Sequence, residues 1–307
     1  MMDLSEYRTK IDEIDRQLVA LFTERMATAA DIAAYKKAHH LPVLDAARER
    51  QKLRQIAELA PAALQNETQM LYRLLFALSR SYQSRLLGPV SPLPAEIEKA
   101  ISDTPQLFPT RAAIACQGVE GAYSQLACER LFRTAEISCF PDLDAVFAAV
   151  DEGLCRYAVV PLESSAVCDL MMRCNFRIVR SVRLKPDRCP TSAVGEESSE
   201  SAQGGNSTRF LCISKQLEIY PGADRTSLMM TLPREPGALA DVLSCLSALG
   251  VSLGRLESHA PPAQGAACTF YFELESPVSS PQFLQCMEEL GKISEGCSYL
   301  GSYCEVV

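Results

Sequence analysis

Two cations in the first forty residues share one face of an expected helix and could together bind a small anion. Arg25 and Lys36 are eleven residues apart, about three helical turns, so their side chains point to the same side. Arg8 lies seventeen residues before Arg25, roughly 100° round the helix, and points elsewhere. If this helix pairs with a second copy, Arg8 can enter the partner's site while Arg25 and Lys36 line their own.

Two further polar groups repeat helical spacing later in the chain. Asp45, Arg48 and Glu49 stand at positions i, i+3 and i+4, so they share one face of a second expected helix. Ser79 and Gln83 have the same i, i+4 spacing on a third helix. Charged residues on an amphipathic helix usually form only its solvated face. The occurrence of the whole set is what favours a binding site.

Three helices are expected to carry these side chains within an all-helical domain over residues 1–88. The first covers residues 3–39, where apolar residues recur at three- and four-residue spacing. Pro42 breaks this run, Asp45 is suited to cap a helix over 46–59, and a third helix runs roughly over 68–86. Two shorter helices cannot cover the apolar stripe of so long a partner, which predicts a homodimer or a larger homo-oligomer.

Composition indicates a folded, multidomain chain of 307 residues, of which 48% are hydrophobic. The apolar runs are too short to cross a bilayer, and the N-terminal residues lack a signal-like apolar block, so we expect a cytoplasmic protein without membrane contact. Thirteen cysteines form no C-x-x-C pair, and three histidines are too few for a zinc site with family-like spacing. Reduced thiols are therefore favoured over a disulfide framework, and neither metal nor cofactor is expected.

Charge is distributed unevenly along the chain. Residues 1–88 hold 13 Lys and Arg against 11 Asp and Glu, whereas the whole chain has a net charge of −8. A locally cationic helical segment in an acidic protein favours a small anionic ligand over nucleic acid, which calls for a basic domain or stripe.

The rest of the chain changes pattern twice. Residues 89–110 contain five prolines and are expected to form a linker. From residue 111 the order of expected elements is β-α-β-α-β, followed by an alternating strand over 176–184, typical of an α/β layer with a parallel sheet. Residues 223–307 show the order β-α-β-β-α-β of a ferredoxin-like α+β domain.

The helical region resembles the all-helical chorismate mutase domain over "EYRTKIDEIDRQLVALFTERMATAADIAAYKKAHHLPVLDAARERQKL" and "LLFALSRSYQ". Members of that family are intertwined dimers that rearrange chorismate to prephenate. The resemblance implies that the substrate is bound by Arg8 from the partner chain, Arg25, Lys36, Asp45, Arg48, Glu49, Ser79 and Gln83. The arginines would hold the substrate carboxylates, Lys36 and Gln83 would face the ether oxygen, and Glu49 would take the ring hydroxyl.

These residue types suit the implied chemistry. The rearrangement is pericyclic and needs no nucleophile or proton transfer, but it needs a flexible dianion held in one reactive conformer. Guanidinium groups hold carboxylates in a defined geometry. Negative charge builds on the ether oxygen as the C–O bond breaks, so donors from Lys36 and Gln83 would stabilise the transition state more than the ground state.

The middle region, residues 111–190 and 206–222, resembles the first lobe of prephenate dehydratase. "GVEGAYSQLA" is similar to that family's glycine motif, with Gly118, Gly121, Tyr123 and Ser124 at matching positions, and "NSTRF" places Thr208 as the retained catalytic threonine. A plain tight turn also explains a lone G-x-x-G before a helix.

Two departures from the dehydratase pattern indicate lost activity. The family's Glu-Asn-Ser-Thr is replaced by the run 163–166, Glu-Ser-Ser-Ala, and the glycine that follows is Cys168. The second lobe is replaced by residues 191–205, a Ser-, Gly- and Glu-rich stretch expected to be a disordered linker. Dehydration with decarboxylation needs an acid and a closed cleft. One lobe supplies only half of that cleft. A second protomer that supplies the missing wall is the alternative.

The C-terminal region, residues 223–307, resembles the ACT domain of the same bifunctional enzyme, which binds phenylalanine for feedback inhibition. The matching positions are Gly237, Ala238, Leu239, Glu257 and Ser258. His259 and Ala260 replace the arginine and proline that end the family motif, so a permanent positive charge is lost. A dimerisation module without its ligand site is the alternative.

The sequence therefore predicts a cytoplasmic chorismate mutase of phenylalanine biosynthesis that carries a truncated, inactive dehydratase domain. Its expected small-molecule partners are chorismate, prephenate and phenylalanine. Two other hypotheses remain open: an enzyme that is still bifunctional and forms phenylpyruvate, and a non-catalytic amino-acid sensor. Loss of a mutase residue would favour the sensor, and none is lost.

Overall fold

The computed structural model describes residues 3–87, 92–162, 165–185, 207–234, 237–259 and 268–306. The chain divides into two compact units that each combine several segments. The first unit contains Met1–Pro92, Gly237–Gly250 and Gln285–Ile293. The second contains Leu93–Pro236, Val251–Leu284 and Ser294–Val307.

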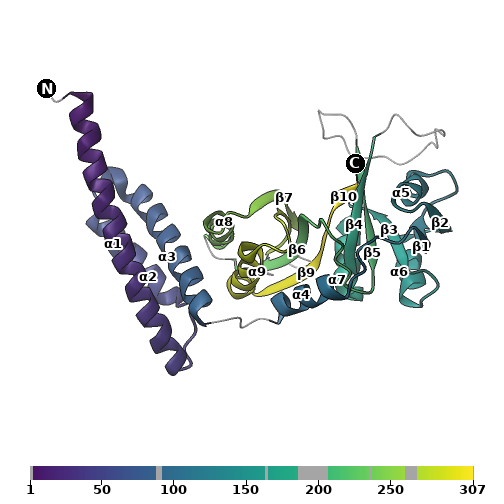
Figure 1. The fold of residues 1–307 in the computed structure, drawn as a ribbon, viewed down its shortest axis with the longest axis horizontal. Helices are drawn as coiled ribbons and strands as arrows, with labels where there is room; N and C mark the ends of the chain where they lie inside the picture. Colours follow the sequence, from purple (N-terminus) through teal and green to yellow (C-terminus); the bar gives the residue numbers. More distant parts are fainter. Residues whose placement is uncertain are drawn as a thin grey trace. The chain divides into compact units, whose positions relative to one another are not determined.

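The predicted three-helix region is confirmed in the first unit (Figure 1). The helices are α1 (Leu4–Ala38), α2 (Ala46–Leu59) and α3 (Gln65–Leu87), and a short 3₁₀ turn η1 (Ala62–Leu64) precedes α3. Asp3 and Glu6 form a reciprocal capping box at the start of α1, which satisfies amide groups that have no partner within the helix. Asp45 caps α2 as predicted, because its Oδ1 accepts a hydrogen bond from the Arg48 amide at 2.9 Å.

Only a short part of the α1 surface is buried within one copy of the chain. Ala29 and Ala33 are buried, at 5% and 1% exposure, in the C-terminal half of α1. In the N-terminal half, Ile11, Leu18 and Leu21 are 57%, 55% and 62% exposed. A stripe of this size on one helix is unusual for a surface that faces water.

The second unit contains a six-stranded sheet with the strand order β10-β4-β5-β3-β1-β2. Its strands are β1 (Arg111–Gln117), β2 (Thr134–Phe140), β3 (Tyr157–Pro161), β4 (Arg177–Leu184), β5 (Thr208–Ser214) and β10 (Glu305–Val306). β1 pairs in parallel with β2 and β3, whereas β5 runs antiparallel to β3 and β4. The sheet is therefore mixed, because β5 runs antiparallel to both of its neighbours while β1 is parallel to both of its own.

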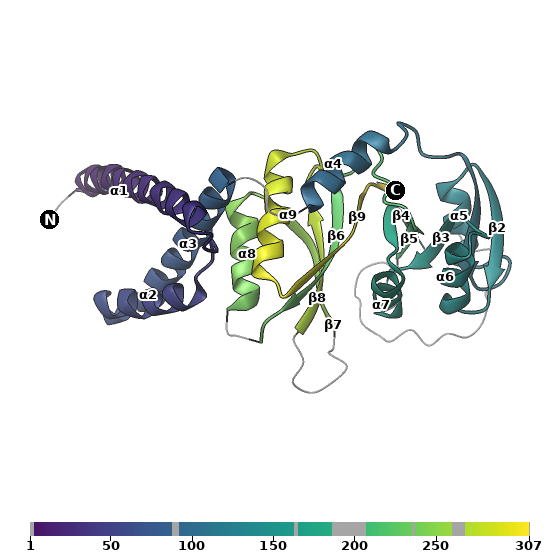
Figure 2. The ribbon, with the colours of Figure 1, turned by 90° about the horizontal axis from the view of Figure 1, so that it is seen from below.

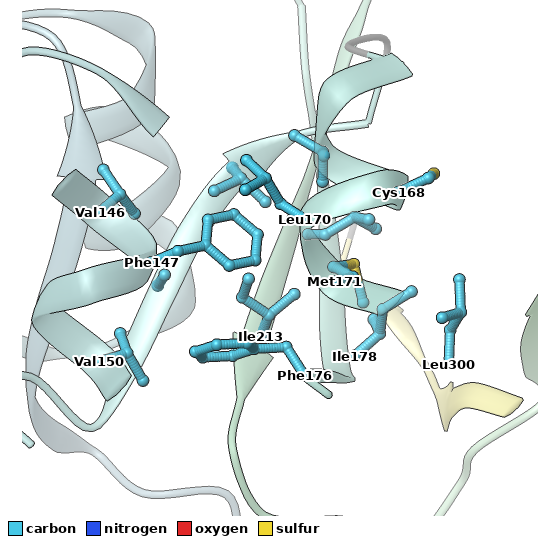
Figure 3. Packing of buried hydrophobic residues seen from close by; sticks show 14 of the residues in the cluster. Val146, Phe147, Val150, Cys168, Leu170, Met171, Phe176, Ile178, Ile213 and Leu300 are labelled. Atoms are coloured by element: carbon cyan, nitrogen blue, oxygen red, sulfur yellow. The ribbon is translucent and has the colours of Figure 1, made fainter. Parts of the chain in front are cut away.

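Helices cover both faces of this sheet, as the residues of its two apolar cores show (Figure 2). α5 (Tyr123–Leu131) contributes to one core, and α6 (Leu143–Asp151) and α7 (Ser165–Cys174) contribute to the other. In the second core Phe147 meets Phe176 edge to face, with the ring centroids 5.0 Å apart (Figure 3). The sequence pattern predicted α5 and α6 but not α7.

The stretch predicted as a Pro-rich linker is not wholly irregular. It contains helix α4 (Leu93–Asp103), in which Ile97 and Ala100 are buried at 0% and 7% exposure. Pro94 lies in the first turn, where a residue without an amide hydrogen is tolerated because that amide would have no helical partner. The prolines therefore mark the start of a packed helix and not only a spacer.

A four-stranded sheet with the order β7-β8-β6-β9 lies in the same unit. Its strands are β6 (Arg225–Leu232), β7 (Ser252–His259), β8 (Cys268–Glu275) and β9 (Gly296–Tyr303). α8 (Ala238–Ala248) follows β6 and α9 (Pro281–Ile293) follows β8, so the chain has the predicted β-α-β-β-α-β order.

The two sheets of the second unit are joined more closely than the predicted boundary at residue 223 suggests. β10 pairs with β4 of the six-stranded sheet, although it directly follows β9 of the other. Gly301 lies against the Ile178 backbone, where a side chain would clash. Arg209 and Glu273 form a buried ion pair at 2.7 Å between the sheets. Opposite charges at this depth are tolerated only when paired, so removing either partner would weaken the compensation of the other's buried charge.

Candidate functional site

Arg25 connects α1 to α3 at the centre of the helical region. Its Nη1 donates hydrogen bonds to the Leu75 carbonyl oxygen at 3.1 Å and to Ser79 Oγ. The guanidinium carbon lies 5.8 Å from the centre of the Phe76 ring, a cation–π distance. Two residues predicted for one site are thus in direct contact, although they are 54 positions apart in the sequence.

The guanidinium of Arg25 is partly removed from water. Burial lowers the pKa of Arg25 below its ordinary value, while the charges of Tyr72 and Glu49 act in the opposite direction. An arginine remains protonated at neutral pH even so. A charged donor with little water around it interacts more strongly with a carboxylate than one on an open surface.

Glu49 is held by a residue that the sequence analysis missed. Arg80 of α3 is buried at 8% exposure, and its Nη1 donates to both Glu49 carboxylate oxygens, at 2.6 and 2.5 Å. This pair orients Glu49 of α2 toward α3. Arg80 follows Ser79 in the sequence, but nothing in its spacing distinguishes it from a solvated arginine.

Gln83 is a buried amide with an unused acceptor. The residue is 6% exposed, and its Oε1 has no hydrogen-bond partner in the described part of the chain. An unpaired buried polar atom is costly, so a bound molecule that pairs with this amide would gain that energy. Rotation of the amide exchanges its oxygen and nitrogen, so either can face such a molecule.

Lys36 lies in the last turn of α1, next to the loop that precedes α2. Its Nζ donates to the Val43 carbonyl oxygen at 2.6 Å and is partly buried. Asp45 serves as the N-cap of α2, and the Arg48 guanidinium is exposed, 3.3 Å from Gln51 Oε1. The structure thus places Lys36 and Asp45 at one end of the helical group.

Arg8 is the predicted site residue that a single copy does not bring to the others. It lies on the exposed N-terminal half of α1, which contains no buried residue before position 25. The other seven predicted residues lie on the C-terminal half of α1, on the first turn of α2 and its cap, or on α3. The arrangement concentrates cations and neutral donors, and its two carboxylates already have partners, Glu49 with Arg80 and Asp45 with the Arg48 amide.

The dehydratase-like motifs lie at the same end of the six-stranded sheet, where β1 ends and β5 begins. The loop with Gly118 and Gly121, both at positive φ, follows the carboxyl end of β1, and Ser124 Oγ donates to the Gln117 carbonyl oxygen at 2.5 Å. Thr208 begins antiparallel β5 opposite Leu184, the last residue of β4. Glu163, Ser164 and residues 191–206 lie outside the described residues, so the predicted linker there stays a prediction.

The predicted effector residues fall in different units, and each group is described separately. Gly237 has φ 99° and caps α8, with Ala238 and Leu239 in its first turn. Free amides at such a helix start suit a carboxylate. Glu257 lies on β7, next to Ser258, and accepts hydrogen bonds from the Arg255 guanidinium at 2.8 and 2.5 Å. His259 ends β7, and Ala260 is outside the described residues.

The described residues contain neither a metal-binding cluster nor a membrane-spanning helix. No group of three or more His, Cys, Asp or Glu side chains there could hold a metal ion. None of the described helices combines the length and apolar character needed to cross a membrane.

Two regions of the chain match known enzyme families. Residues 7–84 match the family model of chorismate mutase type II, and residues 114–186 match that of prephenate dehydratase. The chain is therefore an enzyme in which a chorismate mutase domain precedes a prephenate dehydratase domain. This is the architecture of the bifunctional chorismate mutase/prephenate dehydratases, as the sequence predicts.

Full-length relatives share this architecture. The bifunctional chorismate mutase/prephenate dehydratase of Escherichia coli (strain K12) is 23% identical, and the match covers 96% of this chain and 95% of that protein. The enzyme of Enterobacter agglomerans is 24% identical over 96% and 94%. The Escherichia coli alignment has 379 positions, whereas 96% of 307 residues is about 295, so about 84 positions face gaps in this chain.

Solved structures resemble part of the chain, over 62–64% of its length. Prephenate dehydratase from Streptococcus mutans is 22% identical with a TM-score of 0.51, covering 64% of this chain and 99% of that one. The Arthrobacter aurescens enzyme in complex with L-Phe is 19% identical with a TM-score of 0.50, over 62% and 90%. A quorum-quenching acylase, GqqA, is 26% identical with a TM-score of 0.53, over 62% and 94%.

Proposed function

We propose that this chain rearranges chorismate to prephenate in a site made by α1, α2 and α3 and completed by Arg8 of a second copy. The observation that carries the proposal is the contact of Arg25 with Ser79, beside the buried Gln83 amide, which joins residues from distant parts of the chain. A second copy would also cover the exposed apolar stripe of α1.

The chemistry follows from what these groups can and cannot do. The site has cations to hold a dianion, and Lys36 and Gln83 to meet the ether oxygen as it gains charge. Glu49, held by Arg80, would accept a hydrogen bond from the ring hydroxyl. The reaction moves electrons within one molecule, so correct positioning supplies most of the rate enhancement.

We further propose that the dehydratase domain is inactive. The dehydratase family match ends at residue 186, and about 84 alignment positions face gaps in this chain. Loss of a segment this large agrees with a missing second lobe and leaves Thr208 on a single lobe. Without a closed cleft, neither proton donation to the leaving hydroxyl nor exclusion of water is provided.

Product analysis at neutral pH tests both proposals in one experiment. The purified chain is incubated with chorismate, and chorismate, prephenate and phenylpyruvate are quantified over time. We expect prephenate to accumulate as chorismate is lost, without phenylpyruvate. Formation of phenylpyruvate would show a bifunctional enzyme, and no conversion at all would favour a non-catalytic sensor.

The C-terminal region is proposed to be an ACT domain that binds phenylalanine at the start of α8. Support comes from the β-α-β-β-α-β order and from a solved neighbour that is a complex with L-Phe. Binding to the folded state alone raises the melting temperature, by an amount that grows with ligand concentration. We expect L-phenylalanine to raise the melting temperature more than D-phenylalanine does. Equal shifts, or none at millimolar ligand, would indicate a dimerisation module without a ligand site.

A cytoplasmic location is part of the proposal. Several cysteines in the described part of the chain, Cys116, Cys128 and Cys212 among them, are buried thiols outside any disulfide, which suits a reducing compartment.

A further inference from the structure

Three cysteines gather at the end of β1, in the lobe that the mutase reaction does not use. Cys116 is the penultimate residue of β1, Cys139 is the penultimate residue of β2, and Cys128 lies on α5. Cys116 and Cys128 are fully buried, whereas Cys139 is exposed on β2, which is an edge strand of the sheet. The exposed Cys139 thiol therefore lies beside the buried Cys116 thiol.

Cys116 and Cys139 have the placement that a disulfide bond requires. They are direct register partners in parallel strands, so their side chains point to the same face. Neighbouring strands lie about 4.8 Å apart, within the Cα separation of about 4.4–6.8 Å that disulfides span. Their Sγ atoms are 3.8 Å apart and must approach to about 2.0 Å for the bond to form.

The surroundings of Cys116 favour its thiolate. A hydrogen bond from Cys128 lowers the pKa of Cys116 to about 7, burial opposes this, and hydrogen bonds from Cys139 and Ser124 add to it. Burial and the neighbouring Cys116 charge raise the pKa of Cys139 to about 11. The exposed thiol is thus the weaker acid, and the buried one is the better nucleophile near neutral pH.

We propose that Cys116 and Cys139 form a reversible intramolecular disulfide, with a low-molecular-weight disulfide as the oxidant. This is a modification site in the dehydratase lobe, independent of the mutase activity. Disulfides in reducing compartments are usually transient and redox-sensing, which is the role proposed for this pair.

The reaction proceeds by two exchange steps. The Cys139 thiolate attacks one sulfur of the small disulfide, forms a mixed disulfide and releases one small thiolate. The Cys116 thiolate then attacks Cys139 Sγ, so the protein disulfide forms and the second small thiolate leaves. Two protein thiols are oxidised, one small disulfide is reduced to two thiols, and their two protons balance the products. The raised pKa of Cys139 makes the first step the slow one.

Oxidation would restrict the motion of the loop that contains Gly118 and Gly121. The Gly118 amide donates to the Phe140 carbonyl oxygen at 2.9 Å, and Ser124 Oγ donates to the Gln117 carbonyl oxygen. Gly118, Gln117 and Phe140, which take part in these bonds, lie within two residues of Cys116 or Cys139. A covalent bond between the ends of β1 and β2 would hold this loop against the edge strand, and we expect the oxidised form to melt at a higher temperature.

The full-length protein tests the proposal directly. Reduced, desalted protein is incubated with mixtures of oxidised and reduced glutathione at about pH 8, near the ordinary pKa of a thiol. Remaining thiols are blocked, the protein is digested, and peptides are identified by mass spectrometry. We expect a linked peptide pair containing Cys116 and Cys139, lighter by two hydrogen atoms than the reduced peptides and lost on treatment with dithiothreitol.

Three variants separate this pair from general thiol oxidation. In Cys139→Ser, Cys116 should stay reduced, with oxidation of Cys116 reduced more than about tenfold. Cys174→Ser removes a partly exposed thiol of α7 and should leave the linked pair unchanged. In Cys116→Ser, glutathione should accumulate on Cys139. Wild-type protein in which Cys139 keeps glutathione, or in which Cys116 links to Cys128, would overturn the proposal.

Discussion

Replacing Lys36 with alanine is expected to lower kcat for chorismate roughly 10²–10³-fold, the usual effect of removing one donor from a developing oxyanion. The Lys36 ammonium already donates a hydrogen bond to the Val43 carbonyl oxygen at 2.6 Å, so it is positioned as a donor before substrate binds. Because the ether oxygen gains charge only as the bond breaks, KM should change much less than kcat. Initial rates of chorismate loss measure both parameters.

Lys37 provides a matched control. It is the next residue on α1 and is exposed, so Lys37→Ala removes the same charge without removing the donor. The control should retain near-normal kcat. Circular dichroism and size-exclusion chromatography should show both variants folded and in the same oligomeric state as the wild type. A folded Lys36→Ala variant with normal turnover would refute the assigned role of Lys36.

Complementation between Arg8→Ala and Arg25→Ala is the second result with a large expected effect. Each variant alone should lose at least about 10²-fold in turnover, because a guanidinium that holds a substrate carboxylate is removed. If Arg8 serves the partner's site, a mixed dimer has one site with both substitutions and one site with neither. Dissociating and reassociating the two variants together should therefore restore activity that neither has alone.

The expected recovery of turnover follows from the number of intact active sites in the mixed dimers. Equal amounts of the two variants give mixed dimers for about half of the population, and one site in each is intact, so about a quarter of wild-type activity should return. Turnover is measured before and after subunit exchange at equal total protein. No recovery, despite proven exchange, would mean that Arg8 acts within its own chain or not at all.

A second pair of variants controls for nonspecific recovery. Arg25 and Ser79 are in contact within one chain, so they belong to the same site. A mixture of Arg25→Ala and Ser79→Ala therefore places one defect in every site of the mixed dimer. This mixture should show no gain on exchange, which distinguishes true complementation from stabilisation by mixing.

The helical site could largely be anticipated from local sequence. The apolar period of the first forty residues sets the length of α1, and Asp45 begins α2 because its carboxylate can accept the Arg48 amide. Helical spacing then fixes which polar residues share a face. These are short-range properties, since each depends on residues within a few turns. The strands of both sheets followed from equally local patterns.

The remaining features depend on contacts between residues far apart in the chain. Arg80 was overlooked because its partner, Glu49, is 31 residues away on another helix, and no period links the two. Cys116 and Cys139 become neighbours only through the register of β1 with β2. β10 leaves the sheet of β9 and pairs with β4, because that edge offers free backbone groups. Local patterns do not encode which distant surfaces meet, so packing decided these three features.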